Sequence, residues 1–155
     1  MEIKINLFIA IVVHGLIVSQ SFSYLISLRN VQLQLDATAY TVFRKLTDAS
    51  FQKNYRPIFY CYLVSSLSLL IFAIVQGTTP ALLLAIVSFL AALADMLLAV
   101  KGNVPINNII NNWHSNTIPD DWRNYRRRWL SIFSWRQFVT ITGFIALVVM
   151  AVFFN

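Results

Sequence analysis

Four long apolar runs, separated by polar stretches, make up most of the chain. They cover residues 5–28, 57–76, 80–100 and 137–154. Each run has about 18 residues or more, which is enough for a helix to cross the roughly 30 Å of hydrocarbon in a bilayer. The pattern therefore predicts an all-α protein: an antiparallel bundle of four transmembrane helices that forms a single domain over residues 1–155.

The first long connection, between the first and second runs, has the pattern of a short amphipathic helix. Asp36 is a suitable N-cap, and Pro57 marks the start of the second span. Arg44 and Asp48 are four residues apart, so they are expected to pair on the helix surface. The simplest interpretation is a connector that lies along the membrane surface among lipid head groups.

The second long connection, between the third and fourth runs, contains two sets of signals. Gly102 and Pro105 are expected to end the third span. Thr117, Pro119 and Asp121 are typical of a helix N-terminus. From there the pattern continues as one helix into the fourth span.

Lysine and arginine are distributed unevenly along the chain. Eleven of the twelve lie in the two long connections or at the start of the fourth span, whereas the tight turn at residues 76–79 has none. Cytoplasmic loops are enriched in these residues, so both connections are expected in the cytoplasm and both termini outside, in a bacterial inner membrane. Contact with anionic lipids accounts for the net charge of +6, and no nucleic-acid partner is expected.

The chain has one cysteine and two histidines, which restricts redox and metal chemistry. Cys61 alone cannot form an intrachain disulfide or a CxxC motif. His14 lies in the first span and His114 in the second long connection, so the expected topology keeps them apart and no shared metal is predicted. No cofactor is expected; the alternative is a haem bound through His14.

One face of the helix that enters the fourth span combines arginine with aromatic residues. Projected at 100° per residue, Trp122, Arg126, Trp129, Phe133 and Arg136 fall within an arc of about 80°. A guanidinium held among indole rings can stack on them and still donate hydrogen bonds to an anion. This favours a pocket at the cytoplasmic end of the bundle; the alternative is an aromatic belt with arginines that only set the topology.

The third span contains an acid, Asp95, on a stripe of small residues that lets helices approach closely. A carboxylate inside a membrane needs a partner, and Arg136 is the expected one. The pair is either a structural salt bridge or part of a catalytic site. The stripe consists of Ser88, Ala91, Ala92, Asp95 and Ala99.

Further polar residues are candidates for substrate binding. Gln20 and Tyr24 belong to a polar stripe of the first span. Asn103 and Asn107 lie in an asparagine-rich stretch near Trp113. These asparagines either satisfy turn geometry or direct their amide groups at a ligand beneath the bundle.

Several motifs in residues 102–136 have a familiar arrangement. The stretch "GNVPIN", a tryptophan a few positions later, "DWxxxRxRW" at residues 121–129 and an arginine seven residues after the last tryptophan resemble the anthrone-oxygenase-like family of small four-helix membrane proteins, which is largely catalogued as a domain of unknown function. The named activity of that family is the cofactor-independent oxygenation of an anthrone to an anthraquinone.

The resemblance implies an oxidoreductase for a lipophilic aromatic substrate. Such a protein removes a proton, stabilises the resulting anion and excludes water. The expected roles are ring stacking by Trp113, Trp122 and Trp129, anion stabilisation by Arg126 and Arg136, hydrogen bonding by Asn103 and Asn107, and proton abstraction by Asp121, Asp95 or His114. The alternative is a non-enzymatic module that binds a lipid or quinone, or an accessory subunit of a membrane complex. A homo-oligomer is compatible with either interpretation.

Overall fold

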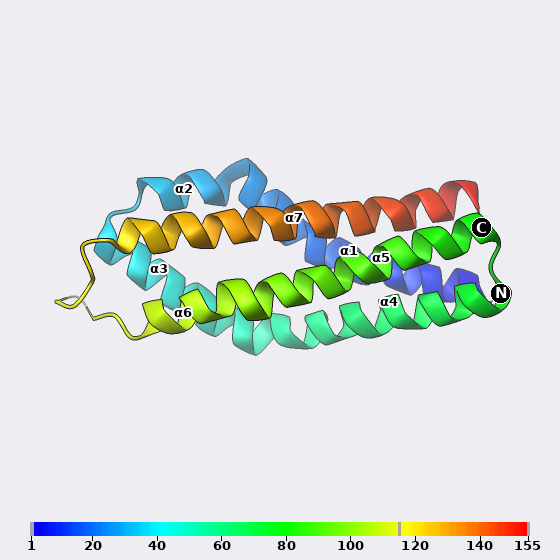
Figure 1. Cartoon of the computed structure of the whole chain (residues 1–155), viewed down its shortest axis with the longest axis horizontal. Coiled ribbons are helices and arrows are strands. Elements are labelled where there is room, and N and C mark those ends of the chain that lie inside the picture. Colours follow the sequence, from blue (N-terminus) through cyan, green and yellow to red (C-terminus); the bar gives the residue numbers. More distant parts are fainter. Residues whose placement is uncertain (1, 115, 155) are drawn as a thin grey trace.

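In a computed structural model, the chain forms four long helical rods that pack side by side (Figure 1). The structure describes residues 2–114 and 116–154. The first rod consists of α1 (Glu2–Ser23), the π-helical η1 (Tyr24–Leu28) and α2 (Arg29–Gln34). The second consists of α3 (Ala37–Ser50), the π-helical η2 (Phe51–Tyr55) and α4 (Arg56–Gln76). The third consists of α5 (Thr79–Leu98), the π-helical η3 (Ala99–Asn103) and α6 (Val104–Asn111), and the fourth is α7 (Trp122–Phe153). The predicted all-α four-helix bundle is confirmed.

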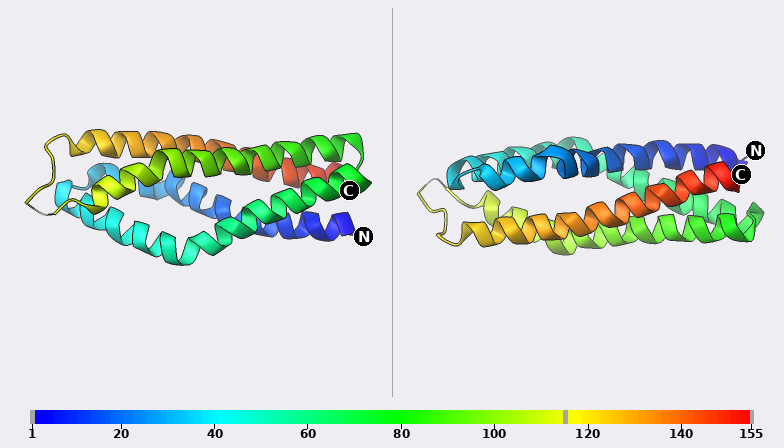
Figure 2. Two further views of the ribbon diagram at one scale, coloured as in Figure 1. Left: turned by 60° about the horizontal axis from the view of Figure 1, so that its bottom comes forward. Right: turned by 90° about the horizontal axis from the view of Figure 1, so that it is seen from above.

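The most extensive contacts between the rods form a closed ring. Helix α1 packs on α4, α4 on α5, α5 on α7, and α7 back on α1. Both termini and the turn between α4 and α5 lie at one end, here called the terminal end (Figures 1 and 2). Residues 35–36 and 112–121 join the rods at the opposite end, the connection end. Consecutive rods are therefore antiparallel neighbours.

Each rod is longer than a bilayer requires. The rods contain 33, 40, 33 and 32 residues, and all four are long and apolar enough to cross a membrane. At about 1.5 Å per residue they measure roughly 48–60 Å, against about 30 Å of hydrocarbon. The protein is thus a membrane protein whose helices extend well beyond the apolar runs, mainly towards the connection end.

The first long connection differs from its expected form. Asp36 is the N-cap, since its Oδ1 accepts a hydrogen bond of 2.8 Å from the Ala39 amide. Helix α3, however, does not lie apart along the surface, because it continues through η2 into α4 as one rod. The physical reason is that its buried face, which includes Tyr40 and Arg44, packs into the bundle against α6 rather than on lipid.

The second long connection also departs from expectation. Gly102 and Pro105 do not end the third rod, which stays helical through η3 into α6. Pro105 lies in the first turn of α6, directly after the π segment η3. At Gly102 a Cβ atom would lie 2.7 Å from Ile132 Cγ2, so glycine permits close contact with α7.

The start of α7 lies slightly later than predicted. Thr117 does not cap it; its hydroxyl accepts a hydrogen bond from the His114 amide and closes a turn instead. The helix begins at Trp122, and Asp121 occupies the N-cap position without a side-chain capping bond. From there α7 is one continuous helix into the fourth span, as predicted.

The small-residue stripe of α5 is buried against α7. Ser88, Ala91, Ala92 and Asp95 are all buried, and α5 and α7 form the most extensive helix pair of the bundle. A Cβ atom built on Gly143 of α7 would lie 2.8 Å from Ala91 Cβ. Close helix approach at this point therefore depends on glycine.

We expect Gly143→Ala to lower the free energy of unfolding by about 1–3 kcal/mol, because the added methyl group overpacks the contact with Ala91. Thermal unfolding in detergent measures this. Gly15→Ala is the matched control, since a Cβ there meets only Phe144 at 3.9 Å. Adding Ala91→Gly to Gly143→Ala is expected to restore stability. If Gly143→Ala and Gly15→Ala had the same free energy of unfolding, the close contact between Gly143 and Ala91 would be contradicted.

Candidate functional site

A cavity of about 580 Å³ lies inside the bundle at the level of the three π-helical segments. All four rods contribute to its wall. The aromatic lining residues are Tyr24, Phe51, Tyr55, Phe59, Tyr60, Trp129 and Phe133, and the main polar ones are Gln20, Arg44, Asp48, Asn103, Asn107 and Arg136. The cavity therefore has a mostly aromatic wall with cations, amides and one carboxylate set into it.

The three π segments lie at the level of the cavity. A π turn contains an extra residue relative to an α turn and is frequent at functional sites. Segment η1 contributes Tyr24 to the wall, η2 contributes Phe51 and Tyr55, and η3 contributes Ala99 and Asn103. The cavity therefore lies where three rods change their helical phase.

An ion pair forms part of the cavity wall. Arg136 Nε lies 2.6 Å from Asp95 Oδ1, and their side chains are 13% and 0% exposed. The guanidinium also donates to Asn103 Oδ1 at 3.4 Å, and Asn103 Nδ2 donates to the Trp129 carbonyl at 3.0 Å. Arg136 and Asn103 line the cavity, whereas Asp95 lies behind them.

Asn107 organises the polar side of the cavity. Its Oδ1 accepts hydrogen bonds from Arg44 Nη2 at 2.7 Å and from Trp129 Nε1 at 2.9 Å. Its Nδ2 donates to Asp48 Oδ1 at 2.7 Å. Asp48 accepts two more hydrogen bonds, from Asn111 at 2.8 Å and from Gln52 at 2.9 Å. One amide thus links α3, α6 and α7, and it joins Arg44 to Asp48, which the sequence pattern had paired directly.

Arg44 has free hydrogen-bonding capacity inside the protein. It is only 3% exposed, and its guanidinium carbon lies 3.7 Å from the centroid of the Trp129 ring. Within the described part of the chain, its Nε and Nη1 atoms and the buried Tyr55 hydroxyl have no hydrogen-bond partner. Buried polar groups of native proteins are nearly always satisfied, so this group of unpartnered atoms is the unusual feature of the cavity wall.

Packed aromatic rings lie beside Arg44 in the same wall. Trp129 and Phe133 stack with centroids 5.0 Å apart and an interplanar angle of 11°. Tyr24 lies 4.4 Å from Phe133 and 5.8 Å from Trp129. The wall next to the Arg44 cation is therefore aromatic.

The structure brings together only some of the residues proposed from sequence. Those lining the cavity are Gln20, Tyr24, Asn103, Asn107, Trp129 and Arg136. Asp95 reaches it only through Arg136. Arg126, Asp121, Trp113 and Trp122 lie elsewhere.

Arg126 holds the end of the first rod instead of facing the cavity. Its Nη1 donates to the carbonyl groups of Gln32 at 2.9 Å and Leu35 at 3.0 Å, as a helix C-terminal capping cation does. The expectation that Arg126 and Arg136 act on the same anion is therefore wrong. They share a helix face but are ten residues apart, which is about 15 Å along the axis.

The predicted stack of three tryptophans is also wrong. Trp122 lies about two turns from Trp129 and packs near Tyr40, with ring centroids 5.7 Å apart. Trp113 contacts Tyr125 edge-on at 5.3 Å and borders a separate pocket of about 340 Å³ together with His114. Neither ring reaches the cavity.

Two of the acids and bases proposed for proton abstraction are also distant from the cavity. Asp121 and His114 are both exposed in the second connection, and neither lines the cavity. Asp48, which the sequence analysis did not propose, is the carboxylate that does line it.

His14 is a buried structural residue. Its Nδ1 lies 2.9 Å from the Ala10 carbonyl, and its Nε2 lies 3.0 Å from Ser88 Oγ. Its ring packs edge-on against Tyr62 at 4.4 Å. These surroundings do not fit a haem, since both nitrogens already have partners. Among the described residues, no group of three or more His, Cys, Asp or Glu side chains is placed to hold a metal ion.

The sequence analysis missed the contribution of the second rod. Arg44, Asp48, Phe51 and Tyr55 line the cavity, but α3 had been interpreted as a surface connector. A signal was present, because Arg44 lies beside the face that carries Tyr40 and Phe51. Charge at an apolar helix face indicates that this face meets polar groups of a protein interior rather than lipid.

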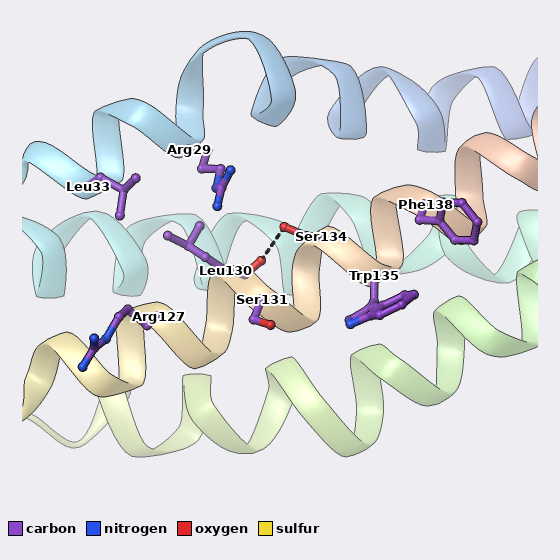
Figure 3. A pocket seen from close by; sticks show the side chains of 8 residues that line it. All are labelled: Arg29, Leu33, Arg127, Leu130, Ser131, Ser134, Trp135 and Phe138. Atoms are coloured by element: carbon purple, nitrogen blue, oxygen red, sulfur yellow. Dashed lines mark hydrogen bonds between the residues drawn. The ribbon is translucent and has the colours of Figure 1, made fainter.

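A second hollow lies on the outside of the bundle between α2 and α7 (Figure 3). This groove measures about 790 Å³ and is bordered by Arg29, Leu33, Arg127, Trp135 and Phe138, all of which are exposed. None of the site residues proposed from sequence lies in it. The inner cavity is therefore the candidate site.

We expect Asp95→Leu and Arg136→Leu each to lower the free energy of unfolding by roughly 3–5 kcal/mol, because each leaves one charge buried without its partner. The double variant is expected to lose much less than the sum. Unfolding in mixed detergent micelles measures all three. A double variant whose loss equals the sum of the two singles would mean that the two groups do not interact.

Comparison with known proteins found no matching family model, and neither a curated protein nor a solved structure matches the chain.

Proposed function

We propose that the protein is a membrane oxidoreductase that binds a lipophilic phenol or enol in the inner cavity and promotes the reaction of its anion with dioxygen. The observation that supports this most directly is Arg44: a buried guanidinium on the Trp129 ring with two nitrogen atoms unpartnered among the described residues. A cation set among aromatic rings is suited to an oxygen anion on a flat ring system.

The arrangement of the two arginines assigns them different roles. Arg136 is already paired with Asp95, so its charge is largely neutralised. Arg44 is held in place by Asn107 through one nitrogen, which leaves its other donors for the ligand. Arg44 is therefore the residue that binds the substrate oxygen, and Arg136 with Asn103 shapes the adjacent wall.

The reaction class comes from the resemblance to anthrone oxygenases. In that reaction a CH₂ group of the substrate and one O₂ molecule give a C=O group and one water molecule. The substrate anion supplies the electrons, one oxygen atom forms the new carbonyl and the other leaves as water. The protein contributes by binding the anion and excluding water.

The cavity also bears on the choice of substrate. Asp48, the carboxylate of the wall, already accepts three hydrogen bonds from amide groups. A substrate that is itself acidic does not depend on a further base. The substrate class that fits is a phenol or enol whose anion is delocalised over fused rings.

A non-enzymatic module that binds a quinone or lipid is the second candidate. It is favoured by the same three hydrogen bonds to Asp48, because they already engage both oxygen atoms of the carboxylate that lines the cavity. For either function, the excess of lysine and arginine at the connection end supports a cytoplasmic location of that end in a bacterial inner membrane.

We expect purified protein in detergent to convert anthrone to anthraquinone under air, followed by absorbance, and Arg44→Gln to reduce the rate by roughly 100-fold, because anion stabilisation is lost. Arg44→Lys is expected to be intermediate, since lysine keeps the charge but loses the stacked planar group. Arg128→Gln, at an exposed position outside the cavity, is the matched control and is expected to retain the parent rate.

Two outcomes would contradict the proposal. If the parent protein gives no turnover with several anthrones but binds an anionic quinone in an Arg44-dependent manner, the non-enzymatic candidate is correct. If Arg44→Gln and the parent have the same rate, the cavity is not the site. Thermal unfolding of each variant separates loss of function from loss of fold.

A further inference from the structure

We infer that the ligand of the inner cavity is a tailed lipid, with its ring in the cavity and an alkyl or isoprenoid tail that leaves through a side window between the second and third rods. This inference rests on the proposed binding of a ring in the cavity and adds the class of molecule to which the ring belongs.

The exposed part of the cavity wall lies on one side only. The exposed lining residues are Gln52, Arg56, Tyr60, Val100, Val104 and Asn108. The first three belong to the second rod and the others to the third. None of the lining residues of the first and fourth rods is exposed. The cavity therefore opens between the second and third rods and is closed towards the other two.

The opening is a window and not a slit along the whole bundle. On its terminal side, α4 packs on α5, and on its connection side, α3 packs on α6. Between these contacts the second rod bends outward where α3 meets α4 (Figure 2). This is the level of η2 and η3, so the cavity and its mouth lie at the same π segments.

The two rims of the window differ in polarity. Towards the connection end, the mouth is bordered by Gln52, Arg56 and Asn108. Towards the terminal end, it is bordered by Tyr60 and Val100, each 58% exposed. Exposed apolar side chains of a membrane protein face lipid, whereas exposed polar ones face head groups or water. The window thus lies across the boundary between head groups and hydrocarbon.

Apolar side chains continue from the window along the outside of both rods. On α4 the exposed residues Val64, Leu67 and Ile71 follow Tyr60 at helical spacing. On α5, Leu97 and Leu90 continue the line from Val100. A tail that passes the apolar rim therefore meets a hydrocarbon-facing surface without crossing a polar group. A ligand with its ring at Arg44 and its tail over Tyr60 and Val100 would pass from the cavity over the apolar rim to this hydrocarbon-facing surface.

The test uses two probes with the same acidic ring: 2-hydroxy-1,4-naphthoquinone and its 3-decyl derivative. Binding to the protein in detergent is measured by calorimetry, with Arg44→Gln as the blank for partition of each probe into micelles. After that correction, the decyl probe is expected to bind at least tenfold more tightly than the untailed probe. Val100→Trp and Val104→Trp, which fill the window, are expected to reduce binding of the decyl probe about tenfold and to reduce binding of the untailed probe by a smaller factor.

Val87→Trp is the matched control, because Val87 is also exposed on α5 but does not line the cavity. A second measurement does not depend on the folding of the tryptophan variants. Tyr60→Cys is prepared in a Cys61→Ser background, since the native cysteine is itself exposed. The decyl probe is expected to protect the introduced thiol from a maleimide, and the untailed probe is not.

The outcomes separate the two levels of the proposal. If neither probe binds the parent protein, the proposed function fails together with this inference. If both probes bind equally well and neither slows maleimide labelling of the Tyr60→Cys variant, the cavity binds the ring as proposed, but the inference that the ligand carries a tail is wrong. If the window variants weaken both probes to the same degree, the window holds part of the ring itself, which also overturns the inference.

Discussion

Inside a bilayer, every backbone amide and carbonyl group needs a partner within the protein, because lipid offers none. A bundle of helices meets this condition. Here η1, η2 and η3 keep the rods helical while changing the phase of three of them. The cavity and its mouth lie at the level of these three segments.

Among the described residues, most polar groups around the cavity have partners within the protein, and the exceptions include two nitrogen atoms of Arg44. Asp95 neutralises Arg136, and three amide groups occupy Asp48. Asn107 fixes Arg44 and Trp129 with a single oxygen atom. The result is a connected wall in which Asn107 and Trp129 hold Arg44 in place. A cation held in this way is preorganised for electrostatic stabilisation of an anion.

Much of the fold was predictable because it depends on local chemistry. The apolar runs specified four spans, Asp36 was recognisable as an N-cap, and the small side chains around Ala91 indicated a close helix contact. The partnership of Asp95 with Arg136 followed from the cost of an unpaired charge in a membrane. The site was less predictable. A helical projection gives the angle of a side chain but not its height, so it made Arg126 and Arg136 equivalent although about 15 Å separates them along the axis. The π segments have no comparable sequence signal, and without them the second rod could not be placed against the cavity.

The seam between the first and fourth rods has a consequence for how the protein can associate with others. Ser21 and Thr140 share a hydrogen bond of 3.0 Å across this seam, and Gln137 donates to the Ser21 carbonyl at 2.9 Å. The cavity is sealed on that flank, so all exchange with the surroundings takes place on the opposite one. A neighbouring subunit docked on α4 and α5 would block the entry and release of a ligand, whereas one docked on α1 and α7 would leave them unaffected. The face used for assembly would thus decide whether the cavity of a complex is accessible to ligand.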